Sequence, residues 1–257
     1  MEASRLLPIA EDIYIVDPWP AVYIESLDTL VLADLHLGVE GALEKEGIFL
    51  PLNVSLIVSK YVEEALEDSK ASRLLLLGDV KHEFGFPNPS EWIEVKKLLN
   101  GLLARRIRVA VIRGNHDNYL ISILRRLNTP IHQTHLNLDK YSFVHGHLPL
   151  KTEEMGEVIF MGHEHPSVRI RAETGVTHKF KCFLVGDLRG KMLIVLPASN
   201  ELAGGVDVNV ASPSEFLSPI LRGCDLGLFT PYLLDPGHAV HRFPQLKFLG
   251  TMSYGRA

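Results

Sequence analysis

Residues that can ligate metal ions recur along this sequence directly after hydrophobic segments. They offer carboxylate, amide and imidazole groups, which suit manganese, iron, zinc, nickel or cobalt. The two cysteines, Cys182 and Cys224, lie far from these groups in the sequence and match no zinc spacing. The groups are Asp34-Leu35-His36, Gly78-Asp79, Gly114-Asn115-His116-Asp117, His145-Gly146-His147 and Gly162-His163-Glu164-His165.

The spacing within these groups suits ligands that share an ion. Asp34 and His36 are two residues apart, and so are His163 and His165. In extended backbone such a pair leaves the same face of the chain and can bind one cation. Asp79 has two carboxylate oxygens and can bridge two cations. The sequence therefore predicts a site for two metal ions.

The local charge of such a site would attract a phosphate ester. Two divalent ions bring about +4 and the carboxylates of Asp34 and Asp79 about −2, so a bridging hydroxide would leave about +1. The whole chain, by contrast, has a net charge of −5. Two ions roughly 3.5–4 Å apart generate hydroxide near neutral pH and stabilise an in-line displacement. His116 is the natural general acid, because it follows Asn115 and imidazole titrates near neutral pH.

The first half of the sequence alternates predicted strands and helices, as βαβ units do. Asn88-Pro89-Ser90-Glu91 predicts a helix start, with Asn88 as the cap and Glu91 reaching back to it. The first three metal-binding groups each follow a strand, at the end where ligands gather in open α/β sheets. The predicted strands are 21–25, 30–33, 73–77 and 107–112, and the predicted helices are about 52–66, 89–103 and 119–127.

The second half is rich in predicted strands, as a second sheet would be. The predicted strands are 131–136, 141–144, 158–161, 178–185 and 191–196. We expect one domain over residues 1–257, in which residues 198–257 form an irregular C-terminal extension packed on the rest. That stretch contains Gly204-Gly205 and several prolines.

Composition narrows the functional classes. A net charge of −5 and a pI near 6.2 disfavour a nucleic-acid binder held by a broad basic field. No apolar stretch approaches the roughly 18–20 residues needed to cross a bilayer, and the N-terminus lacks a signal-peptide core. We therefore expect a cytoplasmic protein without a membrane partner.

The series of groups resembles the calcineurin-like metallophosphoesterases over roughly residues 20–205. Ala33-Asp34-Leu35-His36-Leu37-Gly38 and Leu196-Pro197-Ala198-Ser199-Asn200 are similar to the prokaryotic branch that contains the phosphoesterase associated with DNA ligase. The resemblance implies an α/β fold, a four-layer αββα sandwich of two mixed β-sheets flanked by helices. It also places the site at one edge of the sandwich.

The resemblance further implies two divalent transition-metal ions per chain, with manganese preferred and iron, zinc, nickel or cobalt as alternatives. His116 would be the general acid, and Asp79 would be shared by both ions. The first ion would take Asp34, His36, Asp79 and His165, and the second would take Asp79, Asn115, His145 and His163.

One position departs from the family pattern. Many members have a second aspartate three residues after the first, and it orients the catalytic histidine; here that position is His82. His82 is expected to contact the substrate or to support a ligand, and Asp117 is an alternative partner for His116. His147 is expected to be a supporting residue beside the site, and Asn200 to line its mouth.

These features predict a metal-dependent hydrolase of phosphodiesters or phosphomonoesters, acting on a small molecule or a nucleotide. A DNA or RNA nuclease of the repair type is the alternative, and a non-catalytic metal-binding scaffold is a more distant one. A homodimer is left open. Pairs of basic residues such as Lys96-Lys97 and Arg125-Arg126 are expected to be solvated helix faces rather than a track for a nucleic-acid backbone.

Overall fold

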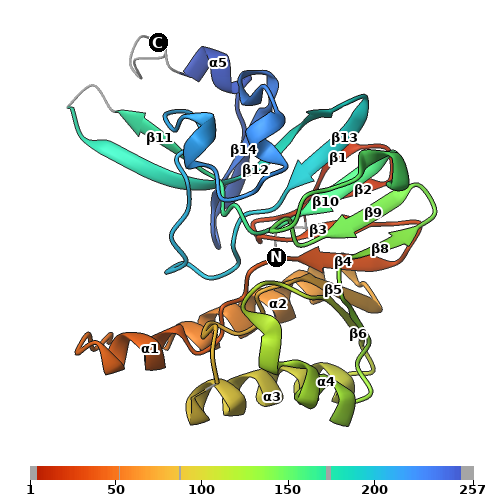
Figure 1. Cartoon of the computed structure of the whole chain (residues 1–257), viewed down its shortest axis with the longest axis vertical. Helices are drawn as coiled ribbons and strands as arrows, with labels where there is room; N and C mark the ends of the chain where they lie inside the picture. The colour runs from red at the N-terminus through yellow and green to blue at the C-terminus, as the bar shows by residue number, and fades with distance from the viewer. Residues whose placement is uncertain (1–4, 52, 87, 172–174, 250–257) are drawn as a thin grey trace.

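Two mixed β-sheets pack face to face in the computed structural model of the chain, which describes residues 5–51, 53–86, 88–171 and 175–249 (Figure 1). Helices flank the sheets, as the sequence predicts. Within the described residues, no helix combines the length and hydrophobicity needed to span a bilayer.

The first sheet has seven strands in the order β1 to β7. Strands β1 to β4 pair antiparallel, and β4 to β7 pair parallel. The strands are β1 (Arg5–Ala10), β2 (Ile13–Asp17), β3 (Val22–Ile24), β4 (Thr29–Leu32), β5 (Arg73–Leu77), β6 (Arg108–Ile112) and β7 (Ile131–His132).

The helices that cross between the parallel strands lie together on the outer face of the first sheet (Figure 1). They are α1 (Val39–Lys45), α2 (Val54–Ser69), α3 (Pro89–Ala104) and α4 (Ile121–Arg126). Helix α3 begins as predicted, with Oδ1 of Asn88 accepting from the Glu91 backbone N–H at 2.8 Å. The Glu91 side chain does not return to this cap. It accepts instead from the backbone N–H groups of His82 and Glu83, both at 2.7 Å.

The second sheet has eight strands, in the order β15-β14-β12-β13-β10-β9-β8 with β11 paired to β12. Strands β9, β10 and β13 are parallel, and the other pairs are antiparallel. The strands are β8 (His135–Leu138), β9 (Tyr141–Val144), β10 (Val158–Met161), β11 (Ser167–Arg171), β12 (Thr177–Leu188), β13 (Lys191–Val195), β14 (Thr230–Asp235) and β15 (Ala239–Arg242).

The predicted strand 131–136 is divided between the two sheets. Its first part is β7, which pairs with β6, and the chain then crosses through Gln133 and Thr134 to begin β8 at His135. Strands β5, β9 and β10 have the predicted bounds. Strands β1, β2 and β11, like β14 and β15 of the C-terminal extension, were not predicted from the sequence.

The inner faces of the sheets form one of three hydrophobic clusters. Val31 and Leu75 from the first sheet meet Phe143, Phe160 and Ile194 from the second, and all five are at most 3% exposed. The rings of Phe143 and Phe160 stack with centroids 5.2 Å apart. Replacing such a buried phenylalanine with alanine costs roughly 3–5 kcal/mol. This packing holds the ends of the two sheets together, where the metal-binding groups begin.

The C-terminal extension was expected to be irregular because of its prolines and glycines. Part of it is regular instead. Strands β14 and β15 extend the second sheet from β12. The short 3₁₀ turns of the extension and α5 (Leu246–Leu249) cover the outer face of this sheet, where Phe216, Leu221 and Phe229 are buried. The helical layer on this side is therefore much thinner than the layer over the first sheet.

Candidate metal centre

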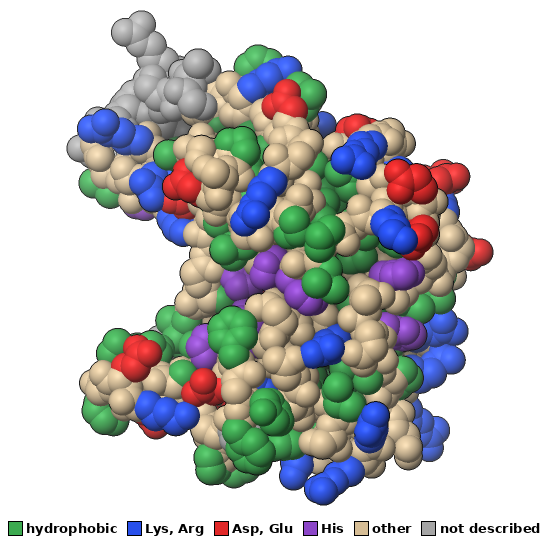
Figure 2. Space-filling model, in the orientation of Figure 1, with side chains coloured by type: hydrophobic (Ala, Val, Ile, Leu, Met, Phe, Trp, Pro, Cys, Tyr) green, Lys and Arg blue, Asp and Glu red, His purple; other side chains and the backbone are tan. Residues whose placement is uncertain are grey.

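The predicted site residues gather at one edge of the sandwich. Asp34 and His36 follow β4, Asp79 follows β5, and Asn115 and His116 follow β6. From the second sheet, His145 follows β9, and His163 and His165 follow β10. Figure 2 shows histidine side chains exposed beside a deep hollow in this face of the molecule. The structure thus brings together groups that lie more than 130 positions apart in the sequence.

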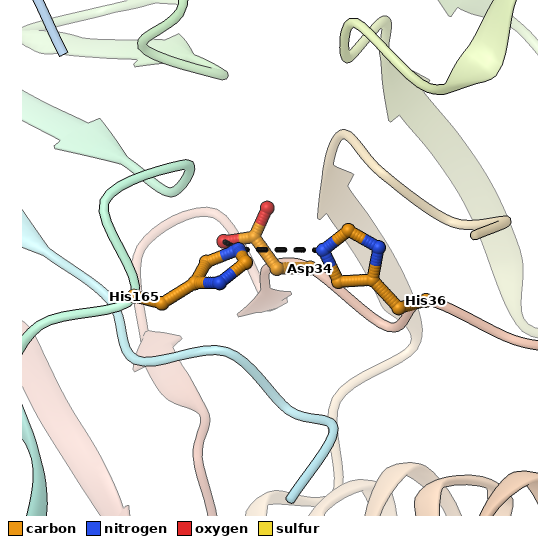
Figure 3. Close-up of side chains that lie close together, drawn as sticks. All are labelled: Asp34, His36 and His165. Atoms are coloured by element: carbon orange, nitrogen blue, oxygen red, sulfur yellow. Dashed lines mark hydrogen bonds and ion pairs between the residues drawn. The ribbon is translucent and has the colours of Figure 1, made fainter. Parts of the chain in front are cut away.

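Asp34, His36 and His165 form the first cluster of ligand atoms (Figure 3). The Nε2 atoms of the two histidines are 3.4 Å apart, and Nε2 of His165 is 3.5 Å from Oδ2 of Asp34. One ligand atom from each residue lies within 4.8 Å of the other two. The three side chains are arranged to surround one ion.

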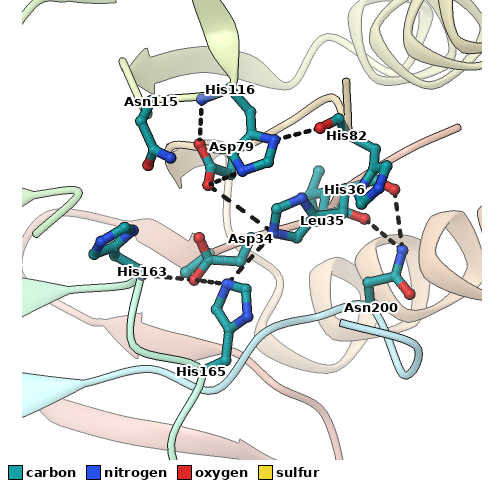
Figure 4. Close-up of polar contacts among 12 residues, drawn as sticks. Asp34, Leu35, His36, Asp79, His82, Asn115, His116, His163, His165 and Asn200 are labelled. Atoms are coloured by element: carbon teal, nitrogen blue, oxygen red, sulfur yellow. Dashed lines mark hydrogen bonds and ion pairs between the residues drawn. The ribbon is translucent and has the colours of Figure 1, made fainter. Parts of the chain in front are cut away.

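Asp79, His145 and His163 form a second cluster of the same kind. Nε2 of His145 is 3.4 Å from Oδ2 of Asp79 and 3.0 Å from Oδ1 of Asn115. Asn115 therefore presents its amide oxygen to this cluster, as the sequence predicts (Figure 4).

The carboxylate of Asp79 lies between the two clusters. Its Oδ2 is 3.9 Å from Nε2 of His36 in the first cluster and 3.4 Å from Nε2 of His145 in the second. The same oxygen is 3.7 Å from Nε2 of His116. One oxygen thus faces imidazoles from both sheets, as a shared ligand must.

The backbone at these residues adopts an uncommon conformation. Five of the predicted ligands have positive φ: Asp34 (55°), His36 (41°), Asp79 (48°), His163 (69°) and His165 (48°). The left-handed region costs an L-residue roughly 1–2 kcal/mol. Such residues cluster at functional sites, where neighbouring structure enforces them. Here a ladder between loops does so, since His36 N donates to Asp79 O at 2.9 Å and Asp34 N to Gly78 O at 3.2 Å.

The glycines in two of the motifs are required by close packing. A Cβ on Gly114 would lie 2.1 Å from Oδ1 of Asp79, and a Cβ on Gly78 would lie 2.4 Å from Nδ1 of His145. Both distances are far inside van der Waals contact. The absence of a side chain at these positions lets the three loops converge on the carboxylate of Asp79.

Hydrogen bonds from the far side of the rings orient two of the imidazoles. Nδ1 of His145 is 2.7 Å from the carbonyl oxygen of Leu77, and Nδ1 of His165 is 2.7 Å from that of Gly204. Because a carbonyl only accepts, each Nδ1 carries the proton and donates it. Each Nε2 then faces its cluster; the nearby carboxylates favour a proton there, which a bound metal ion would displace.

Burial and charge together set the protonation states. Burial by itself raises the pKa of Asp79, but the neighbouring imidazoles, His145 above all, more than offset this and lower the pKa. Burial lowers the pKa of His145, and the charges of Asp79 and Asp34 reverse this and raise the pKa to about 9. Burial and nearby imidazoles lower the pKa of His36 to about 3 and that of His163 to about 4. The last two rings are therefore neutral at pH 7, as ligands must be.

The donor set fits divalent metal ions. Oδ1 of Asp34 is buried and accepts no hydrogen bond from any described residue. Buried carboxylate oxygens are normally satisfied, so an unsatisfied one beside three imidazoles calls for a cation. Two carboxylates, one amide oxygen and neutral imidazoles are the ligands that transition-metal ions take in hydrolytic sites.

Comparison with known proteins agrees with this geometry. The model of the calcineurin-like phosphoesterase family matches residues 27–180, which is more than half of the chain. The chain belongs to this family. It is accordingly a metallophosphoesterase, a hydrolase that acts on phosphoester bonds. No curated protein sequence matches it.

Solved structures similar to this phosphoesterase include a nuclease, MPE, from Pseudomonas putida. That match has a TM-score of 0.62 at 20% sequence identity and covers 90% of this chain and 94% of the nuclease. YfcE, a phosphoesterase from E. coli, matches with a TM-score of 0.39 at 23% identity, covering 69% of this chain and 83% of YfcE. The first match shows that the fold is shared; the second is too weak to support an argument.

The phosphoesterase uses Asp117 to join two of its loops. Its carboxylate is fully buried and accepts from the backbone N–H groups of Val80 at 3.0 Å and Gly114 at 2.9 Å. Burial and the charge of Asp79 raise its pKa to about 6. Nδ1 of His116 contacts the backbone carbonyl oxygen of His82 rather than this carboxylate. Asp117 therefore supports the loops, and the main chain at position 82 takes the place of the missing aspartate.

Asn200 lies beneath the loop of the first motif rather than at the mouth of the site. It is fully buried, and its Nδ2 donates to the carbonyl oxygens of Leu35 at 3.0 Å and His36 at 3.1 Å (Figure 4). Its Oδ1 accepts from Leu202 N at 2.9 Å. The motif around Asn200 therefore positions Asp34 and His36 from below.

His82 and His147 lie beside the clusters. The His82 ring centroid is 5.4 Å from that of His36 and 5.9 Å from that of His116. The His147 ring centroid is 5.1 Å from that of His145. Burial and the charge of His145 lower the pKa of His147 to about 4. Both rings are close enough to support a ligand or to reach a bound substrate.

Glu164, between two predicted ligands, was not identified from the sequence. It is fully buried and accepts from the backbone N–H groups of Leu217 at 3.1 Å and Ser218 at 2.8 Å. Ser218 in turn donates from Oγ to the carbonyl oxygen of Gly146 at 2.7 Å. The C-terminal extension thus holds both histidine loops of the second sheet. Its position between two predicted histidine ligands was the sequence signal that could have identified Glu164.

Proposed function

We propose that this phosphoesterase hydrolyses a phosphodiester or a phosphomonoester at two divalent metal ions held between its two sheets. The observation that carries the proposal is the position of Asp79 Oδ2 between imidazoles of both clusters. One ion would be held by Asp34, His36, Asp79 and His165. The other would be held by Asp79, Asn115, His145 and His163. The ligand set suits manganese first, with iron, zinc, nickel or cobalt as alternatives.

The bound ions would supply water activation near neutral pH and neutralise charge on the phosphoryl oxygens. The protein's own groups hold the cations and fix the positions of the ligands. The lowered pKa values of Asp34 and Asp79 keep both carboxylates ionised, so they can hold the cations over the working pH range. The loop ladder fixes their positions before the substrate binds.

His116 is proposed as the general acid. Hydrolysis adds the oxygen of water to phosphorus, breaks the bond to the leaving oxygen and requires a proton on that oxygen. Nδ1 of His116 is held by the carbonyl oxygen of His82, and Nε2 points toward the clusters, 3.7 Å from Oδ2 of Asp79. From this position Nε2 can deliver the proton as the bond breaks.

A nuclease of the repair type is the second candidate. We propose further that the protein is cytoplasmic and that it belongs to the branch of the family associated with DNA ligase. The nuclease candidate is supported by the fold shared with the Pseudomonas putida nuclease and by the motifs at 33–38 and 196–200. The exposed ring of Phe84, stacked on His116, favours it further. Dimerisation remains a prediction.

The test is a parallel assay of the purified chain loaded with manganese. Bis(p-nitrophenyl) phosphate, p-nitrophenyl phosphate and single-stranded DNA would be offered under the same conditions, with elemental analysis of the bound metal. We expect about two ions per chain and hydrolysis of at least one substrate. A loaded protein inert toward all three would contradict the catalytic proposal and favour the scaffold, and a protein that binds no metal would contradict both.

A further inference from the structure

One exposed aromatic ring stacks on the proposed general acid, and two more pair with each other on the same two loops. The ring of Phe84 stacks on the imidazole of His116, with centroids 3.6 Å apart and an interplanar angle of 29°. Phe86 and Tyr119 meet edge to face at 5.5 Å. Phe84 is 59% exposed, Phe86 76% and Tyr119 45%. We call these three residues the aromatic platform.

The aromatic platform is built by the loops that carry the ligands. Phe84 and Phe86 follow the Gly78-Asp79 motif, and Tyr119 is three residues after His116. A single exposed aromatic residue needs no explanation, but a group of them beside a reacting centre marks a binding surface. None of the three belongs to the hydrophobic clusters of the core. Their exposed rings are therefore available to a ligand bound next to His116.

We propose that the aromatic platform binds a nucleobase on the leaving-group side of the scissile phosphodiester, so that the substrate class is single-stranded nucleic acid. The inference rests on the proposed function. If His116 protonates the leaving oxygen, the group attached to that oxygen lies beside its imidazole. One face of the Phe84 ring covers that imidazole, and most of the Phe84 side chain is exposed. A flat ring in the leaving group can therefore stack on Phe84.

The surface of the aromatic platform consists of exposed rings, with two cations nearby. Glu83 pairs with Lys45 at 3.0 Å, whereas Arg113 donates to the neutral amides of Gln133 and Asn118 and keeps its charge. The rings themselves therefore offer stacking to a base. Stacking on aromatic side chains tolerates any base and requires an unpaired strand. We therefore expect little sequence preference and a preference for single strands.

The experiment compares oligothymidylate with an abasic oligonucleotide of the same length, built on tetrahydrofuran sugars. We expect wild-type protein to prefer the first by about tenfold in kcat/KM and in equilibrium binding followed by fluorescence anisotropy. Phe84→Leu and Phe86→Leu should each reduce this preference, chiefly through KM. Phe248→Leu, an exposed phenylalanine of α5, is the matched control and should retain it.

Two outcomes would contradict base binding by the aromatic platform. One is equal affinity of the wild-type protein for both oligonucleotides, and the other is an unchanged preference in both Phe84→Leu and Phe86→Leu. Inactivity toward every phosphoester would instead reject the proposed function. The binding comparison would still show whether the aromatic platform binds a base in that case, because fluorescence anisotropy requires no turnover.

A separate observation concerns Glu91, a buried carboxylate outside the metal clusters. It is fully buried, and its Oε1 accepts from the backbone N–H groups of His82 and Glu83. Its Oε2 has no hydrogen-bond partner among the described residues. Lys81 is 1% exposed and donates from Nζ to the carbonyl oxygen of Glu83. Two buried charged side chains thus hold one short stretch of main chain.

That stretch carries the carbonyl oxygen that contacts Nδ1 of His116. We infer that Glu91 is a positioning residue for His116, acting through the peptide at His82. A peptide carbonyl can replace an orienting carboxylate only if its own position is fixed. Glu91 fixes it from the rigid start of α3, where Asn88 caps the helix.

The test uses phosphodiesters with good and poor leaving groups, because loss of a general acid matters most when the leaving group is a poor one. Glu91→Ala should slow an alkyl ester at least about tenfold more than a p-nitrophenyl ester, as His116→Ala should. Glu91→Gln keeps an accepting oxygen and should recover much of the rate. His82→Ala keeps the carbonyl and should preserve the leaving-group pattern.

A uniform loss across all leaving groups in Glu91→Ala would overturn the positioning role. If Glu91→Ala does not fold, Glu91→Asp decides the question, since its shorter side chain withdraws the accepting oxygen from both N–H groups and should give an intermediate leaving-group dependence. A wild-type dependence in Glu91→Asp together with an altered one in His82→Ala would assign the positioning to the His82 side chain instead.

Discussion

The two halves of the metal centre are held in place by different means. Loops of the first sheet support one another: Asp117 joins the loops after β5 and β6, and Glu91 holds the main chain just beyond Asp79. Loops of the second sheet depend on a distant segment, because Glu164 and Gly146 are bound by Leu217 and Ser218 of the C-terminal extension. The loops after β5 and β6 are thus stabilised locally, whereas the loop after β4 also depends on Asn200 and the second half depends on Leu217 and Ser218.

This difference matters for how the site is assembled. The first half contains both carboxylates and the proposed acid; residues 78–117 support its loops after β5 and β6, and Asn200 supports the loop after β4. The second half contributes imidazoles, and it can take its final form only after the extension has packed over the outer face of its sheet. Perturbing the extension at Leu217 and Ser218 should therefore weaken metal binding while leaving the loops after β5 and β6 in place.

The largest effect is expected where the halves meet. Asp79→Asn removes the charge that faces imidazoles of both clusters, so we expect kcat/KM to fall at least roughly a thousandfold. The bound metal should also drop below two ions per chain. Activity on bis(p-nitrophenyl) phosphate and elemental analysis would measure both. Asp235→Asn, at an exposed position of β14, is the matched control and should be neutral. Near-normal activity in Asp79→Asn would exclude a shared ligand.

A paired experiment separates the two means of support. Glu164→Ala leaves two backbone N–H groups of the extension unsatisfied and should destabilise the fold by about 2–4 kcal/mol. It should also weaken metal binding roughly 10–100-fold through the neighbouring histidines. Asp117→Ala should destabilise by a similar amount but perturb the ligands of the first sheet.

Urea unfolding and metal titration would be measured for both variants. Removal of metal should lower the unfolding midpoint of wild type more than that of Glu164→Ala, because the variant gains less from binding. Unaltered metal affinity in Glu164→Ala would show that the extension stabilises the fold without shaping the second half of the site.

The smallest effect is expected for Ser218→Ala. This change removes the hydroxyl that donates to the carbonyl oxygen of Gly146, and a hydrogen bond of this kind contributes about 0.5–1.5 kcal/mol. The urea midpoint should fall slightly, and metal affinity should change less than in Glu164→Ala. A loss equal to that of Glu164→Ala would mean that the two contacts act as one unit.

Local patterns predicted several elements in the first half of the molecule well. Strand β5 is a run of leucines ended by glycine, and α3 begins at an asparagine cap followed by proline, so short-range chemistry defines both elements. Strands β14 and β15 lacked such a signal, because prolines and glycines interrupt the sequence around them. They form because β12 offers an unpaired edge, a fact that no local window contains.

The chemistry available to the site could be read from residue types alone: the ligand types, their order and their position after buried strands. How those ligands are held depends on the folded chain. The left-handed backbone at five of them, the carbonyl of His82 against His116 and the anchoring of Glu164 all depend on contacts between residues far apart in the sequence. A residue's type is local, but its conformation and hydrogen-bond partners are set by whatever the completed fold packs against it.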